Sequence, residues 1–300
     1  MRIMVVGAGV IGTVYGAHLG AAGHEIAVLA RGPRTVTIAR EGLNARDLMT
    51  NADTRSPAIV LERSDAARFD LVLVAVRRDQ LAAAGSRLVH LSGLPLVLVF
   101  GNNPEGRAGV PDEIPGTVRL GFPGVGGTIR ADVAEYVRIR QQPTALEAAP
   151  DPRLDAIKAT LRERGLVVQE VSDMPGWLAY HAVFIAGVTA ALYRCQADPR
   201  RLADDRGTLD LMCRAITEGF GDLHARGVGG LPRNLAILHH PLLRPVAVRY
   251  WAHTMRSEMG ELAFAAHARH AQPEMRALAH DVLASASDQT RSGPLEQLLR

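Results

Sequence analysis

The sequence predicts an α/β protein in which an N-terminal Rossmann-like doubly wound sheet is followed by an all-helical C-terminal domain. Short apolar runs alternate with helix-length segments over the first 100 residues, as in a parallel sheet covered on both faces. A glycine-rich turn directly follows the first of these runs. After Ser172 the strand patterns stop, which predicts a domain of residues 1–170 and a second domain of residues 171–300.

The first domain begins with four apolar runs that have the length of strands and not of buried helices. They are Arg2 to Val6, Glu25 to Leu29, Asp70 to Val76 and Leu96 to Phe100. The segments with a helical pattern are Val10 to Ala22, Thr35 to Arg40 and Gln80 to Leu91. Because strands and helices alternate, each strand is expected to lie parallel to its neighbours.

Glycines and short alternating patterns from Val118 to Thr144 predict an antiparallel extension of this sheet. A helix from Asp151 to Glu163 and a strand from Leu166 to Val171 complete the first domain. The predicted helices of the second domain are Pro175 to Leu192, Leu209 to Arg226, Pro245 to Met259, Leu262 to His270 and Pro273 to Ala286. Thr208 is the expected N-cap of the second of these helices.

Composition and charge favour a soluble globular protein, with 47% hydrophobic and 22% charged residues. The net charge of +3 is small and mixed along the chain, so no nucleic-acid partner is expected. Cys195 and Cys213 lack a metal-ligand spacing, and His267 and His270 lack a second ligand cluster, so no metal is expected. The absence of a signal-like start and of an apolar run of membrane length predicts a cytoplasmic protein without a membrane partner.

The glycine-rich turn follows a predicted strand and precedes a predicted helix, which is the context of a dinucleotide-binding site. Gly7 permits the tight turn, Gly9 lets the backbone approach a pyrophosphate, and Gly12 lets the helix pack closely on the strand. Backbone N–H groups at the helix start, from Val10 and Ile11, would then face the phosphates. A turn without a ligand is the alternative interpretation.

Arg31 stands at the end of the second strand, where an NAD site usually carries Asp or Glu for the ribose hydroxyl. A guanidinium suits a 2′-phosphate by its charge and its fork geometry, and Arg34 follows closely. We therefore predict NADPH/NADP as the cofactor. The alternative is that Arg31 is a solvated loop charge.

These features resemble the ketopantoate reductase (2-dehydropantoate 2-reductase) family. The segment Val76-Arg77-Arg78-Asp79-Gln80 is similar to the family's Val-Lys-x-x-Gln element, with Arg77 in place of the lysine. Asn102 matches the Asn-Gly-x-Gly turn that lies near the nicotinamide in the family, and Arg31 to Leu43 resembles its Arg-x(n)-Gly-Leu stretch. The resemblance spans nearly the whole chain. It implies a Rossmann half, a helical half and NADPH-dependent reduction of a 2-oxo acid.

The start of the helical half departs from the family pattern. In the family, a Trp-x-Lys-Leu-x-x-Asn segment supplies the lysine that donates a proton and an asparagine that binds substrate. The matching stretch runs from Trp177 to Val183, with Ala179 at the lysine and Val183 at the asparagine. Gly187 stands at another family asparagine. The resemblance therefore implies a divergent member with a different, less charged substrate, and it makes Glu261 the counterpart of a family glutamate.

Without the resemblance, the residues themselves leave several roles open. His181 titrates in the range required of a catalytic acid, and Tyr180 carries a phenol, yet both could instead pack between helices. Glu261 is either a catalytic or substrate-binding carboxylate or a surface charge near a helix start. Asn102 and Asn103 either bind the cofactor or form an Asn-Asn-Pro turn.

The leading hypothesis is an NADPH-dependent reductase of a carbonyl compound (a 2-oxo acid or related ketone) or of an imine. It would act on a small molecule held in a cleft between the domains. A homodimer is left open. The alternatives are a non-catalytic NADP(H)-binding sensor or partner-binding protein, and a non-redox enzyme on the same scaffold.

Overall fold

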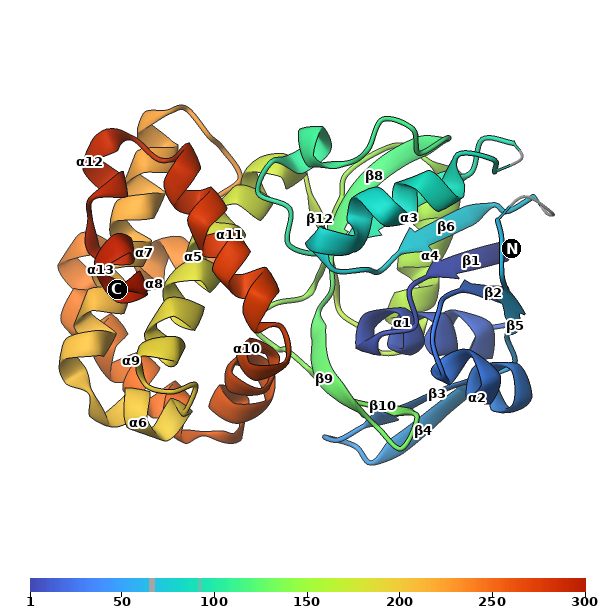
Figure 1. Ribbon diagram of the computed structural model, residues 1–300, viewed down its shortest axis with the longest axis horizontal. Coiled ribbons are helices and arrows are strands. Elements are labelled where there is room, and N and C mark those ends of the chain that lie inside the picture. The colour runs from blue at the N-terminus through green and yellow to red at the C-terminus, as the bar shows by residue number, and fades with distance from the viewer. Residues whose placement is uncertain (65–67, 92) are drawn as a thin grey trace. The chain divides into compact units, whose positions relative to one another are not determined.

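The computed structural model describes residues 1–64, 68–91 and 93–300 (Figure 1). The chain divides into two compact units. The first comprises Met1–Gly101 and Arg107–Met174, and the second comprises Asn102–Gly106 and Pro175–Arg300. The first unit is built on sheets and the second on helices, so the predicted fold class is confirmed.

An eight-stranded sheet forms the frame of the first unit, in the order β12-β11-β8-β7-β6-β1-β2-β5. All neighbours in it are parallel except β11 and β8. Its central strands are buried because, apart from Arg2 at the start of β1, their residues are apolar, as expected for parallel strands covered on both faces. The strands are β1 Arg2–Val6, β2 Glu25–Leu29, β5 Ile59–Leu61, β6 Leu71–Val74, β7 Leu96–Phe100, β8 Thr117–Phe122, β11 Thr144–Glu147 and β12 Val168–Val171.

The helices of the first unit start close to the predicted positions. They are α1 Val10–Ala21, α2 Arg34–Glu41, α3 Leu81–Leu88 and α4 Pro152–Glu163, with short 3₁₀ turns at Arg78–Gln80 and Gly106–Gly109. Asp151 caps α4 by accepting a hydrogen bond from the backbone N–H of Arg153 at 2.9 Å. Proline at the first position of α4 suits this start because its missing N–H would be unpaired there.

A second, four-stranded sheet in the order β4-β3-β10-β9 corrects the prediction of one antiparallel extension. Of the stretch from Val118 to Thr144, only β8 and β11 join the large sheet, and β8 lies parallel to β7. The small sheet consists of β3 Leu43–Asp47, β4 Ala52–Ser56, β9 Val125–Arg130 and β10 Val133–Arg138. It packs against α1. Strands β3 and β4 are short and rich in polar residues, so no apolar run marks them.

Buried polar contacts hold α1 against its surroundings. The His18 ring and the Tyr136 hydroxyl are hydrogen-bonded at 2.8 Å, and burial lowers the pKa of His18 to about 4. The Tyr15 hydroxyl bonds Thr144 Oγ1 at 2.6 Å and accepts from the N–H of Gly124 at 3.0 Å. These hydrogen bonds limit the cost of burying the polar groups and help to set the position of α1.

The second unit is helical throughout its regular structure. Its helices are α5 Met174–Arg194, α6 Pro199–Asp204, α7 Arg206–Ala225, α8 Arg233–Leu238, α9 Arg244–Arg256, α10 Ala266–His270, α11 Gln272–Ser285, α12 Asp288–Arg291 and α13 Pro294–Leu299. A 3₁₀ turn at Pro241–Leu243 and a π-helix at Gly260–Ala265 complete it. The N-cap of α7 is Asp205 and not Thr208. The Asp205 carboxylate accepts hydrogen bonds from the backbone N–H of Thr208 at 2.9 Å and from the Thr208 hydroxyl at 2.7 Å.

Helix α5 is the central core element of this unit. It is long and apolar enough to cross a membrane, contrary to the expectation that no segment would be. However, 83% of its most apolar 18-residue stretch is buried inside the protein. A buried core helix has this same composition. Cys195 and Cys213 are both free and buried.

Candidate functional site

The glycine-rich turn between β1 and α1 is shaped by three different spatial demands. Gly7 has a φ of +100°, and a Cβ there would lie 2.7 Å from the carbonyl oxygen of Ala75. A Cβ on Gly12 would lie 2.0 Å from the carbonyl oxygen of Gly7. At Gly9, by contrast, a Cβ would meet no atom within 4 Å. The turn is therefore closed on the sides of Gly7 and Gly12 and open over Gly9.

This opening lies at the N-terminus of α1. Gly9 is the N-cap residue, and no side chain caps the helix. The N–H groups of Val10 and Ile11 are the first of the helix, and such groups together with the helix dipole favour an anion. The arrangement fits the pyrophosphate of a dinucleotide.

Arg34, the first residue of α2, holds this turn from the side. Its guanidinium donates to the carbonyl of Ala8 and, at 3.1 Å, to the carbonyl of Asp132. An ion pair of 3.4 Å joins it to the Asp132 carboxylate. Burial lowers the pKa of Arg34, and the Asp132 carboxylate opposes that effect. Arg34 is thus engaged with the protein, so the structure favours a positioning role for it over phosphate binding.

Arg31 lies exposed two residues beyond β2, and a second guanidinium approaches it from α3. Arg87 donates to the carbonyl of Glu62 at 2.9 Å. Because Leu29 of β2 pairs with Leu61 of β5, Glu62 lies next to the end of β2. Burial lowers the pKa of Arg87, and the positive charge of Arg31 lowers it further. Arg87 could not be predicted as part of this site, because nothing in the linear pattern relates α3 to the end of β5.

The remaining cofactor candidates of the sequence differ in their surroundings. Arg77 is exposed and forms an ion pair with Asp79 at 3.1 Å. Asn103 is buried, and its amide donates to the carbonyl of Gly106 at 2.6 Å, so it closes the local turn. The Oδ1 atom of Asn102 is buried without a hydrogen-bond partner among the described residues. The structure thus favours a turn-forming role for Asn103. It leaves Asn102 as a candidate for binding the cofactor or the substrate.

The titratable side chains at the start of α5 are packed into the helical core. His181 is 3% exposed and lies against the rings of Trp177 and Phe184, with centroids 5.0 and 6.0 Å away. Burial lowers the pKa of His181 to about 3, so the imidazole is neutral near pH 7. The Tyr180 hydroxyl donates to the carbonyl of Val228 at 2.9 Å. These surroundings favour the packing interpretation for both residues.

The positions of the two missing asparagines lie in the contact between α5 and α7. A Cβ on Gly187 would lie 2.7 Å from Ile216 Cγ1, and a Cβ on Gly219 would lie 2.5 Å from Val183 Cγ1. Small residues therefore let these two helices approach closely. Val183 and Gly187 thus both take part in the packing of α5 on α7.

Glu261 lies in the π-helix of the second unit and is half-exposed. Its carboxylate is paired with the guanidinium of Arg269, which also donates to the carbonyl of Ala197 at 2.8 Å. The structure thus places Glu261 in a surface ion pair. Among the described residues, no group of three or more His, Cys, Asp or Glu side chains could hold a metal ion.

Comparison with known proteins places these observations in a family context. Residues 3–112 match the family model "Ketopantoate reductase PanE/ApbA", which confirms the resemblance over these residues. No curated protein matches the chain.

Several solved structures resemble the whole chain. A 2-dehydropantoate 2-reductase from Methylococcus capsulatus has 19% identity and a TM-score of 0.71, covering 100% of this chain and 94% of its own. D-mandelate dehydrogenase in complex with NADH has 15% identity and a TM-score of 0.67, with coverages of 100% and 97%. A dimeric ketopantoate reductase from Staphylococcus aureus has 11% identity and a TM-score of 0.63, with coverages of 99% and 97%. At these identities, the likeness establishes the fold.

Proposed function

We propose that this chain is an NADPH-dependent reductase of a carbonyl compound (a 2-oxo acid or related ketone) or of an imine. The opening over Gly9 at the N-terminus of α1 carries the proposal. The match of residues 3–112 to the ketopantoate reductase family supports it. The similarity to an NADH complex of D-mandelate dehydrogenase is consistent with a nicotinamide cofactor.

The first unit supplies the groups that would hold the cofactor. The N–H groups of Val10 and Ile11 would bind the pyrophosphate, while Arg34 keeps the turn in place through Ala8. Arg31 and Arg87 would bind the 2′-phosphate. Two guanidinium groups held near each other repel, and an anion between them removes that cost, so the pair favours NADPH over NADH. When bound, NADPH supplies the hydride.

Asn102 is the candidate for orienting the reacting groups. It follows the end of β7 by two residues, and ligands of doubly wound sheets bind beyond the carboxyl ends of the strands. Its buried Oδ1 has no hydrogen-bond partner among the described residues, and a buried acceptor of this kind costs free energy until it is satisfied. We propose that Asn102 accepts a hydrogen bond from the cofactor amide or from the substrate.

Two measurements on the full chain test this function. Isothermal calorimetry with NADPH and NADH should show binding of both and a preference for NADPH. Absorbance at the NADPH band should then fall with at least one member of a panel of 2-oxo acids, ketones and imines. Absence of binding would exclude the proposal and would favour the non-redox alternative. The homodimer stays a proposal that light scattering would test.

A catalytically silent NADP(H)-binding protein is the second candidate. Two observations favour it. Tyr180 and His181 are packed, and position 179 carries an alanine where the family resemblance implies a proton donor. The substitution Ala179→Lys separates the two candidates. The silent binder would be established if the unmodified chain binds NADPH tightly without oxidising it and the variant does oxidise NADPH. Oxidation by the unmodified chain would exclude it.

A further inference from the structure

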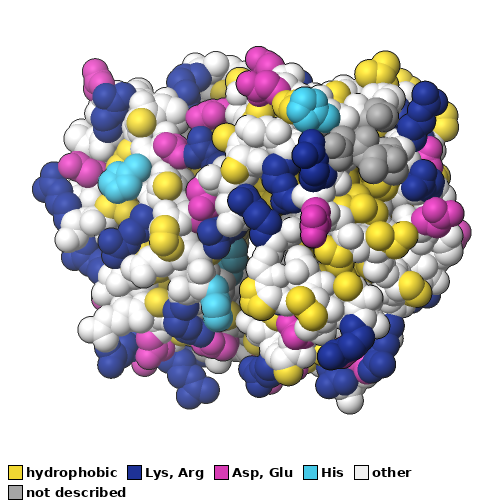
Figure 2. All heavy atoms as spheres, turned by 45° about the vertical axis from the view of Figure 1, so that its right-hand side comes forward, with side chains coloured by type: hydrophobic (Ala, Val, Ile, Leu, Met, Phe, Trp, Pro, Cys, Tyr) yellow, Lys and Arg dark blue, Asp and Glu magenta, His cyan; other side chains and the backbone are white. Residues whose placement is uncertain are grey.

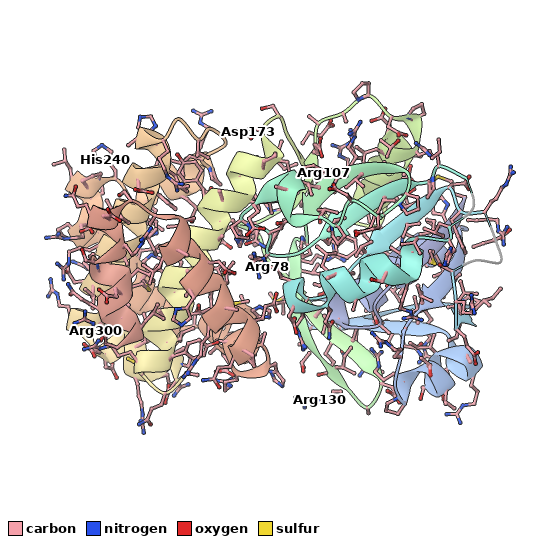
Figure 3. All side chains as sticks on the ribbon, turned by 45° about the horizontal axis from the view of Figure 1, so that its top comes forward. Arg78, Arg107, Arg130, Asp173, His240 and Arg300 are labelled. Atoms are coloured by element: carbon pink, nitrogen blue, oxygen red, sulfur yellow. The ribbon has the colours of Figure 1, made fainter. Side chains whose placement is uncertain are left out.

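A cavity of about 730 Å³ opens on the surface of the helical unit, and none of the residues proposed to hold the cofactor or the substrate lines it. It is lined by parts of α5, α7 and α11 and by the last residues of the chain, which end at Arg300 (Figure 3). Its volume is in the range of small-molecule binding sites. No role in the proposed reduction requires this cavity.

The polar lining of the cavity carries positive charge. Arg194, Arg276 and Arg300 line it together with His280, and no Asp or Glu is among its lining residues. Arg300 is neutralised locally by an ion pair with Glu296 at 2.9 Å. Among the residues that the structure describes, neither Arg194 nor Arg276 forms an ion pair with a carboxylate. The cavity therefore has two guanidinium groups that form no ion pair with an Asp or Glu side chain of the described residues.

Both guanidinium groups are positioned by contacts that leave most of their N–H donors available. Arg194 donates one hydrogen bond, of 2.8 Å, to the carbonyl of Gln297. Arg276 stacks over the ring of Tyr193, with its Cζ atom 5.8 Å from the centroid. The Tyr193 hydroxyl donates to the carbonyl of Ala268 at 2.8 Å, which fixes this platform. Stacking occupies the face of a guanidinium and leaves its edge for a planar oxyanion.

The rest of the lining is apolar. Ala190, Leu211 and Leu298 are buried residues of the helical core that also border the cavity. A ligand that matches both parts of the lining has an anionic head and an aliphatic body. The arginine fork fits the two oxygens of a carboxylate, and the apolar residues can cover methylene groups.

We propose that this cavity binds an aliphatic carboxylic acid, with its carboxylate between Arg194 and Arg276 and its chain on Leu211 and Leu298. The test uses the full chain without cofactor, so its outcome is independent of the proposed reductase activity. Hexanoate, acetate and inorganic phosphate serve as probes in calorimetry and thermal unfolding. Hexanoate should bind at least about tenfold more tightly than acetate, because each buried methylene adds affinity.

Matched substitutions identify the site. Arg276→Gln should weaken hexanoate binding at least about tenfold, since it removes a charge-assisted hydrogen bond, and Arg194→Gln should do the same. Arg200→Gln changes an exposed arginine of α6 outside the lining and should leave the affinity unchanged. Circular dichroism checks that each variant is folded. Equal affinity of Arg276→Gln and Arg200→Gln would overturn the proposal, as would phosphate binding more tightly than hexanoate or no binding of hexanoate.

Discussion

The starts of α1 and α5 differ in what the chain places around them. At α1, glycines close the turn on two sides and leave open space over Gly9, with no side chain capping the helix. At the start of α5, the space is filled by the packed rings of Trp177, Tyr180 and His181, and the Tyr180 hydroxyl is hydrogen-bonded to a backbone carbonyl. The first region leaves room for a ligand, whereas the second is part of a packed core. The structure therefore supports the proposed cofactor more directly than it supports a proton donor on α5.

The largest effect that would test this comparison is expected from Gly12→Ala. The added Cβ would collide with the backbone carbonyl of Gly7, which cannot move like a side chain. We expect a loss of about 3 kcal/mol in the free energy of unfolding and no detectable NADPH binding, measured by denaturant titration and calorimetry. Gly221→Ala is the control, since a Cβ there meets no atom within 4 Å. Equal stability of the two variants would contradict the described packing.

The arginine pair at the end of β2 predicts a change in cofactor preference. Arg31→Ala and Arg87→Met should each weaken NADPH binding about 10- to 100-fold, because each removes a charge-assisted contact to the 2′-phosphate. NADH binding should stay the same. Arg40→Ala removes an exposed charge that is paired with Glu41 on α2, and it should change neither affinity. A parallel loss of NADPH and NADH affinity would instead assign Arg31 and Arg87 to the fold.

His181→Phe tests the interpretation of α5 as packed core. The pKa of about 3 in the folded chain lies below the ordinary 6.5, so the unfolded chain takes up a proton first as the pH falls. Stability from the neutral ring is present above pH 6.5 and is lost as the pH falls toward 3. Between pH 7.5 and pH 5, the free energy of unfolding of the variant should therefore fall by roughly 2 kcal/mol less than that of the unmodified chain. Loss of NADPH oxidation by the folded variant would show that His181 takes part in the chemistry.

Gly9→Ala should have the smallest effect of these substitutions. Its backbone is extended, with φ −73° and ψ −173°, and a Cβ has open space, so the fold should tolerate it. The methyl group would project toward the bound pyrophosphate, and we expect about a tenfold loss of NADPH affinity. Calorimetry measures the affinity, and thermal unfolding serves as the check on stability. Unchanged affinity would show that the phosphates do not approach Gly9.

The arrangement of the charged side chains could not be predicted from the composition alone. Basic side chains are spread over the visible face in Figure 2 with acidic ones among them, which agrees with the mixed charge of the sequence. The proximity of Arg31 and Arg87, however, depends on the register of β2 and β5. No linear pattern contains that register, so only the folded chain could identify the pair.

Local chemistry determined much of this protein directly from its sequence. The predicted boundaries of β1, β2 and β7 agree with the structure because short apolar runs between turns favour buried strands. The turn at Gly7 follows from the spacing of its glycines. Tertiary structure decided three other features: the second sheet, the hydrogen bond from Arg34 to the carbonyl of Ala8, and the packing of Val183 on α7. Each of these depends on contacts between segments far apart in the chain, where the same side chain can bind a ligand, pair with a charge or fill a core.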